Sequence, residues 1–194
     1  MGAKIWWVRK CYRLRRWWWA TWSHIYIWLF QRKYAHVPLP TDLTPLEVAA
    51  EMRVIKWTKD GTKELGDSIG SAEWFQYLLN VVNETKEQPK GAVDCDNFAM
   101  WAYKVLDQKY APYLLCLSWR DEDGGLHGHC VCGGVGPESG EFFHVGNWGY
   151  MGGHASLGAL LRATVKRAKG TGIIAWAILN DNLYIEKCGF SFPE

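Results

Sequence analysis

Residues 91–106, GAVDCDNFAMWAYKVL, decide the fold that we expect for this chain. Asp94 is a favourable N-cap, because its carboxylate can accept a hydrogen bond from a free helical N–H. Beyond it, apolar residues recur at helical spacing, at Phe98, Ala99, Ala102, Val105 and Leu106. The stretch therefore predicts an amphipathic helix that packs on a core, with Cys95 in its first turn.

The position of Cys95 has opposing effects on its thiol. Free amides and the positive end of the helix dipole favour the thiolate, which is the reactive form. The carboxylates of Asp94 and Asp96 act the other way, because adjacent negative charge raises the pKa of a thiol. A reactive Cys95 therefore needs a cationic partner from elsewhere in the chain, and the alternative is a buried structural cysteine.

Two segments with strand character, residues 127–135 and 141–148, are separated by the turn composition GPESG at residues 136–140. A hairpin centred on Glu138 would set His129 opposite Asn147, and opposed residues point to the same sheet face. Cys130, Cys132 and His144 would then lie on the other face. This prediction depends on the register, since a shift of one residue exchanges the two faces.

A cysteine at a helix start with a histidine and a carboxamide on adjacent strands predicts thiol nucleophilic catalysis. His129 would accept the thiol proton and supply the missing cation, and Asn147 would orient its ring. The backbone N–H of Cys95 would be one oxyanion donor. Gln88 is a candidate for a second donor, with an exposed loop glutamine as the alternative.

The segment Asp94–Ala99 (DCDNFA) and the order Cys…His…Asn resemble the transglutaminase-like cysteine peptidases of the bacterial and phage type, over about residues 42–150. The resemblance implies a papain-like α+β fold, with the nucleophile helix packed on an antiparallel sheet. It also implies a nucleophile at Cys95, a base at His129 and an orienting group at Asn147, where the family usually has Asp. Papain-type enzymes use Asn followed by Trp-Gly, so Trp148 would shield the site.

The implied function is hydrolysis of a peptide or amide bond, or acyl transfer from it, through a thioester on Cys95, with a protein or peptide as substrate. The alternative is a catalytically degenerate structural or assembly protein, such as a virion component of a phage. The segment His127–Cys132 (HGHCVC) also contains metal-ligand types, but its histidines and cysteines would point to opposite faces of a strand. We therefore expect neither a metal nor another cofactor.

Residues 1–40 form a distinct N-terminal arm ahead of a domain at residues 41–194. Seven of the thirteen tryptophans lie in the first 28 residues, and the first 41 residues hold eight basic side chains and no acidic one. The net charge of the whole chain is +2, so the remainder is acidic. We expect a helical arm that docks on its own domain or on another subunit; a membrane surface and, less favoured, a single-stranded nucleic acid are the alternatives.

Composition sets the remaining expectations. A chain of 194 residues with 48% hydrophobic content can bury one core without disulfides, and its six cysteines show no repeating spacing. We expect free thiols, no signal peptide, no transmembrane helix, and a cytoplasmic or virion-associated location. Capping signals predict further helices from Thr44 to about Val54, from Ser71 to about Asn80 and over residues 156–168.

Overall fold

The computed structural model describes residues 21, 24, 25, 27–58, 70–89, 93–180 and 182–193. Its helices are α2 (Pro45–Met52), α3 (Ala72–Thr85), α4 (Cys95–Val105), the short 3-10 helix η1 (Gln108–Tyr110) and α5 (Leu157–Arg167). Its strands are β1 (Tyr113–Asp121), β2 (Leu126–Val135), β3 (Phe142–Gly146), β4 (Gly149–His154), β5 (Gly170–Leu179) and β6 (Ile185–Gly189). The fold is α+β, as the sequence predicts.

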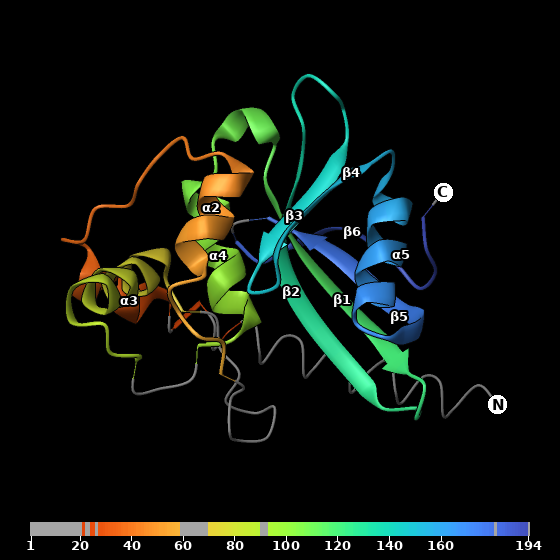
Figure 1. Cartoon of the computed structure of the whole chain (residues 1–194), viewed down its shortest axis with the longest axis horizontal. Helices are drawn as coiled ribbons and strands as arrows, with labels where there is room; N and C mark the ends of the chain where they lie inside the picture. The colour runs from red at the N-terminus through yellow and green to blue at the C-terminus, as the bar shows by residue number, and fades with distance from the viewer. Residues whose placement is uncertain are drawn as a thin grey trace.

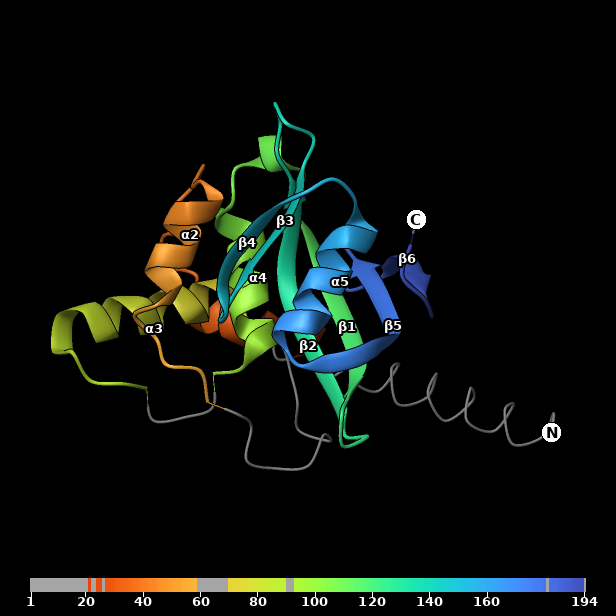
Figure 2. The same ribbon diagram turned by 45° about the vertical axis from the view of Figure 1, so that its right-hand side comes forward.

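The strands form one six-stranded sheet in the order β4-β3-β2-β1-β5-β6, and each neighbouring pair is antiparallel. Helix α4 packs on one face of this sheet, and α2 lies beside it over β3 and β4. Helix α3 packs on α4, and α5 covers the opposite face of the sheet (Figure 1, Figure 2). Both faces of the central strands are therefore buried.

Capping contacts confirm three of the predicted helix starts. Thr44 and Glu47 form a reciprocal capping box, in which the Thr44 N–H donates to the Glu47 carboxylate at 2.8 Å. The hydroxyl groups of Ser71 and Ser156 accept hydrogen bonds from the N–H groups of the third helical residues of α3 and α5. Asp94 is the N-cap residue of α4, but its side chain makes no capping hydrogen bond.

The core on the α4 face is aromatic. Phe75 of α3 meets Phe98 of α4 edge to face with ring centroids 4.9 Å apart, and both side chains are buried. Trp101 is fully buried beside them and donates its indole N–H to Gln76 at 2.9 Å. Phe98 belongs to the apolar spacing recognised in the sequence, whereas the buried Phe75 and Trp101 do not, so the packed face of α4 is wider than that spacing predicts.

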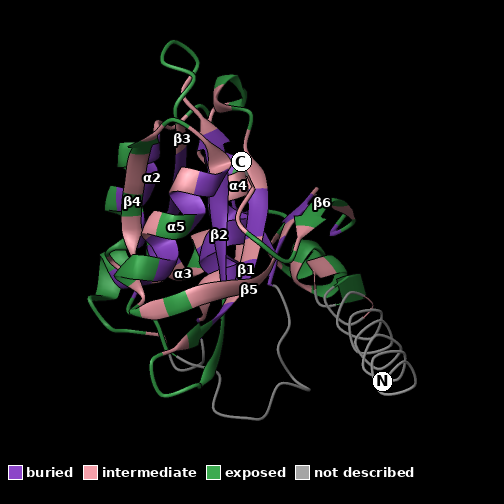
Figure 3. Cartoon of the chain, turned by 90° about the vertical axis from the view of Figure 1, so that its right-hand side faces the viewer, coloured by how far each residue is buried: buried purple, intermediate pink, exposed green. Residues whose placement is uncertain are grey.

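The described end of the N-terminal arm, residues 27–34, is helical. It docks on the same side of the sheet as α4, since Ile27 packs in one cluster with Met100 of α4. Phe30 stacks on Trp74 with centroids 5.2 Å apart, and Tyr34 meets Tyr77 at 4.9 Å. Ile27 packs in a cluster that also includes Ile185 of β6, and Figure 3 shows this part of the arm beside β6. Residues 1–20, 22, 23 and 26 of the predicted arm lie outside the described residues.

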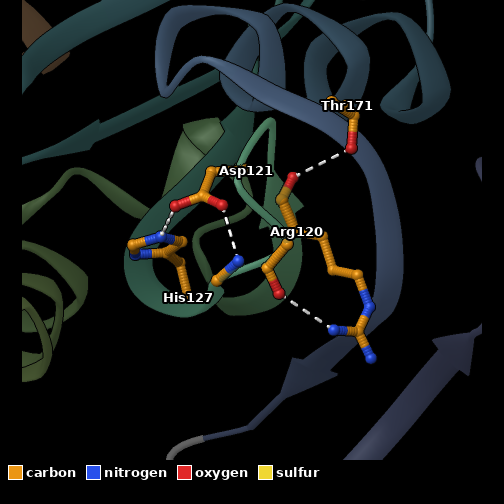
Figure 4. Close-up of polar contacts among 6 residues, drawn as sticks. Arg120, Asp121, His127 and Thr171 are labelled. Atoms are coloured by element: carbon orange, nitrogen blue, oxygen red, sulfur yellow. Dashed lines mark hydrogen bonds and ion pairs between the residues drawn. The ribbon is translucent and has the colours of Figure 1, made fainter.

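Side-chain contacts hold the turn between β1 and β2 (Figure 4). The Asp121 carboxylate accepts the Gly125 N–H at 2.6 Å and lies 2.7 Å from Nε2 of His127. Gly124 has φ of +82°, a left-handed conformation that favours glycine. His127, the first residue of the segment His127–Cys132 with metal-ligand residue types, therefore contacts a carboxylate of its own hairpin.

The predicted register of β2 against β3 is wrong by one residue. Cys132 lies opposite Val145 and Gly133 opposite His144, so the ladder, if continued, would set His129 opposite Trp148 instead of Asn147. The cause is the turn, in which the Gly136 N–H donates to the Glu141 carbonyl at 2.8 Å. Four residues therefore lie between the closing pair, and the hairpin axis falls between Glu138 and Ser139 instead of on Glu138.

Candidate functional site

Cys95 is the first residue of α4 and lies on the α4 face of the sheet. Its side chain packs against a cluster that includes Met100, Leu114 and Cys130. Cys116 and Cys130 are cross-strand partners in β1 and β2, and their Sγ atoms are 3.2 Å apart. The surroundings of the candidate nucleophile are therefore apolar side chains and other thiols.

Burial raises the pKa of the Cys95 thiol well above its ordinary value, and the negative charges of Asp96 and Asp94 raise it further. The backbone N–H of Cys130, which donates a hydrogen bond to the sulfur, lowers this pKa by a smaller amount. Burial and the two carboxylates thus outweigh the amides at the helix start, and the thiol is protonated at neutral pH.

His129 lies on the opposite face of the sheet from Cys95. Its ring stacks on Trp148 with centroids 3.9 Å apart and an interplanar angle of 18°. Trp148 packs in the cluster beneath α5, whereas Cys130, the next residue of β2, packs with Cys95. Because successive side chains of a strand alternate between faces, the sheet lies between the candidate base and the candidate nucleophile.

His129 is 8% exposed, and burial lowers the pKa of its imidazole to about 4. Its Nε2 atom has no hydrogen-bond partner in the described part of the chain. At neutral pH the imidazole is therefore uncharged, and it does not supply the cation that Cys95 was expected to need.

Asn147 and Trp148 form the tight turn between β3 and β4. The Asn147 Oδ1 atom is buried and, among the described residues, makes no hydrogen bond, so Asn147 does not orient His129. Trp148 does cover the His129 ring, as the resemblance implied, and its carbonyl accepts a hydrogen bond from Arg167 of α5 at 2.7 Å. The structure thus brings His129 and Trp148 together and leaves Cys95 apart from both.

Gln88 has a structural contact in place of the suggested oxyanion role. Its Nε2 donates to the Val54 carbonyl at 3.0 Å, and its Oε1 accepts the Lys56 N–H at 2.8 Å. Both ends of the amide are therefore used to join the loop before α4 to the segment after α2.

Sequence reasoning missed a buried histidine cluster beneath α5. His144 is fully buried, on the same face as His129 and not on the other face as predicted, and its Nε2 lies 3.0 Å from Oγ1 of Thr164. Thr164 donates its hydroxyl hydrogen to the Leu160 carbonyl at 2.8 Å, so His144 carries its proton on Nε2. Burial, and secondarily electrostatic interactions with His129, Arg167 and His154, lower the pKa of His144 to about 3. The signal in the sequence was the histidine in the middle of a strand buried on both faces.

Two further properties bear on function. Within the described residues, no three His, Cys, Asp or Glu side chains are arranged so that they could hold a metal ion. In the same part of the chain, no helix has the length and apolar character needed to cross a membrane.

Comparison of the chain with protein-family models, curated proteins and solved structures found no match.

Proposed function

We propose that this chain is a non-catalytic binding or assembly protein, built on an α+β scaffold whose segment Asp94–Ala99 resembles the nucleophile segment of the transglutaminase-like cysteine peptidases. The observation that carries this proposal is the position of Cys95 and His129 on opposite faces of one sheet. A thiol protease needs its imidazole within hydrogen-bond reach of the thiol, and strand alternation opposes such a contact here.

The electrostatics support the same proposal. An ion pair forms when the thiol is the stronger acid, but burial raises the pKa of Cys95 above 9.0 and lowers that of His129 to about 4. Moving the proton from Cys95 to His129 would therefore cost about 7 kcal/mol or more before any attraction between the charges. Both groups are most stable in their neutral forms.

The docked arm supports a binding role. Three side chains of residues 27–34 contact the domain, namely Ile27, Phe30 and Tyr34. Aromatic contacts of this kind add to the apolar area that they bury. The domain thus holds the end of the arm in one position, from which its remaining side chains can meet a partner.

A second candidate function is thiol-dependent hydrolysis or acyl transfer on a protein or peptide substrate. One observation that favours it is the start of α4 at Cys95. Another is that two buried polar atoms, Nε2 of His129 and Oδ1 of Asn147, have no hydrogen-bond partner among the described residues. In that reaction the Cys95 thiolate would form a thioester, and His129 would donate the proton to the leaving amine. It requires the side chains of β2 near His129 to exchange faces.

Alkylation by iodoacetamide, measured against pH and read site by site by peptide mass spectrometry, distinguishes the two functions. We expect Cys95 to react more slowly at neutral pH than the exposed Cys188, and at the same rate in wild type and in His129→Ala. Rapid labelling of Cys95 with an apparent pKa below the ordinary 9.0 of a thiol, lost in His129→Ala, would overturn the non-catalytic proposal. Cys188 in the same sample controls for reagent and pH.

A further inference from the structure

The described end of the arm has two apolar sides, and only one of them contacts the domain. Ile27, Phe30 and Tyr34 face inward, whereas Ile25, Trp28 and Leu29 remain 41%, 54% and 50% exposed. Positions 25, 28 and 29 share one side of a helix because residues three and four apart are neighbours on its surface. We call these three residues the outer stripe.

Cationic side chains adjoin the outer stripe. The Arg32 guanidinium lies over the Trp28 ring, 4.9 Å from its centroid. Position 32 is one helical turn after position 28, so Arg32 lies on the same side of the helix as the outer stripe. The neighbouring Lys33 ammonium lies 5.1 Å from the centroid of Tyr34. The exposed surface therefore combines aliphatic side chains, an indole and fixed positive charge.

We propose that the outer stripe, with Arg32 and Lys33, docks on the surface of an anionic lipid membrane. This inference rests on the proposed binding role of the arm and names its partner. Indole rings favour the headgroup region, aliphatic side chains enter the boundary of the acyl chains, and basic residues are attracted to anionic headgroups. Eight basic and no acidic residues in the first 41 give the arm the matching charge.

Other occupants fit these observations less well. A second copy of the arm would bring like charges together, which opposes association. A single-stranded nucleic acid would stack its bases on aromatic faces, but Arg32 covers a face of Trp28, and Ile25 and Leu29 offer no stacking surface. A lipid surface uses all five side chains.

Co-sedimentation of the full chain with vesicles tests this proposal. We expect binding to vesicles of phosphatidylcholine mixed with phosphatidylglycerol, little binding to phosphatidylcholine alone, and weaker binding as salt screens the charges. Trp28→Ser combined with Leu29→Ser should weaken binding by about tenfold or more, because apolar area no longer enters the bilayer. Arg32→Gln combined with Lys33→Gln should weaken it by about fivefold per residue. Leu46→Ser, at a leucine of α2 that is 66% exposed, is the matched control and should bind as wild type.

Equal binding of wild type and the outer-stripe variants would overturn the proposal, as would equal binding to neutral and anionic vesicles. Binding to a single-stranded oligonucleotide without binding to vesicles would assign the arm to nucleic acid. Light scattering that shows a dimer lost in the outer-stripe variants, without vesicle binding, would assign it to a second copy. None of these readouts involves Cys95 labelling, so failure here is distinguishable from failure of the non-catalytic proposal.

Discussion

The two faces of the sheet differ in their titratable chemistry. The α4 face contains four thiols, Cys95, Cys116, Cys130 and Cys132, whereas the α5 face contains the imidazoles of His129 and His144 near His154 and Arg167. Burial raises the pKa of Cys95 and Cys132, and it lowers the pKa of His129 and His144. The hydrogen bond with Cys116, together with burial, raises the pKa of Cys130. These three thiols and two imidazoles are therefore neutral at neutral pH, and the sheet lies between the thiols of one face and the imidazoles of the other.

This difference shows that separation along the sequence is a poor guide to the distance between side chains in a sheet. His129 and Cys130 are adjacent in the chain but belong to separate clusters on separate faces. Cys116 and Cys130 are 14 residues apart, and their sulfur atoms are nearly in contact. Alternation along a strand and pairing between strands decide which groups can react together.

The largest expected effect comes from breaking the core on the α4 face. Phe98→Ala should lower the free energy of unfolding by about 3–5 kcal/mol, because it removes a buried ring and leaves a cavity beside Phe75. Urea denaturation measures this change. Leu46→Ala, at an exposed position, is the control and should stay within about 0.5 kcal/mol of wild type. A loss below about 1 kcal/mol would mean that α4 does not pack on this core.

Acid should destabilise the protein through the α5 face. The ordinary pKa of a histidine, 6.5, applies to both residues in the unfolded chain, but in the folded state burial lowers the pKa of His144 to about 3 and that of His129 to about 4. Below pH 6.5 the unfolded state therefore binds protons that the folded state excludes, and stability falls as the pH falls. Between about pH 6.5 and about pH 5, we expect the free energy of unfolding to fall by about 2 kcal/mol for each histidine.

Urea titrations at the two pH values, in wild type and in His144→Gln, measure this loss. The variant should lose less stability on acidification, whatever its stability at neutral pH. The same acid dependence in both proteins would show that His144 is not the buried neutral imidazole.

Alkali should destabilise the protein through the α4 face. Burial raises the pKa of Cys132 above its ordinary 9.0, so above that pH the unfolded state loses a proton that the folded state retains. Cys132 makes its full contribution to the free energy of unfolding below pH 9.0. This contribution falls as the pH rises, by about 1.4 kcal/mol at about pH 10. Cys132→Ala should show a flatter alkaline profile in thermal unfolding, and Cys188→Ala, at an exposed thiol, should keep the wild-type profile.

The smallest effect is expected at the exposed hairpin shown in Figure 4. His127 pairs with Asp121 at 2.7 Å, but both side chains are accessible to solvent, and exposed ion pairs contribute little. His127→Gln should leave the urea midpoint unchanged within error at neutral pH. A clear loss of stability would show that the hairpin contact is stronger than its exposure indicates.

Local signals in the sequence were sufficient for much of the fold. The caps at Thr44, Ser71 and Ser156 depend on contacts within a few residues, so these helix starts could be predicted from the local sequence alone. The helix that begins at Cys95 followed in the same way from its apolar spacing.

The candidate site required information that no local pattern contains. The face of His144 relative to His129 depended on whether the turn after Val135 closes over three residues or four, and the closing pair is Gly136 and Glu141. A difference of one residue moves a side chain through the sheet. The structural role of the Gln88 side chain depends on hydrogen bonds with Val54 and Lys56, which lie more than 30 residues away in the sequence.

The amino-acid sequence by itself determined the α+β class, the helix starts, the cysteine at the head of α4 and the basic, tryptophan-rich composition of the arm. Only the tertiary structure decided that Cys95 and His129 lie on opposite faces, that both are neutral, and that the outer stripe is exposed. The physical reason is that helix capping and periodicity act over a few residues, whereas burial and side-chain partners depend on segments brought together by folding.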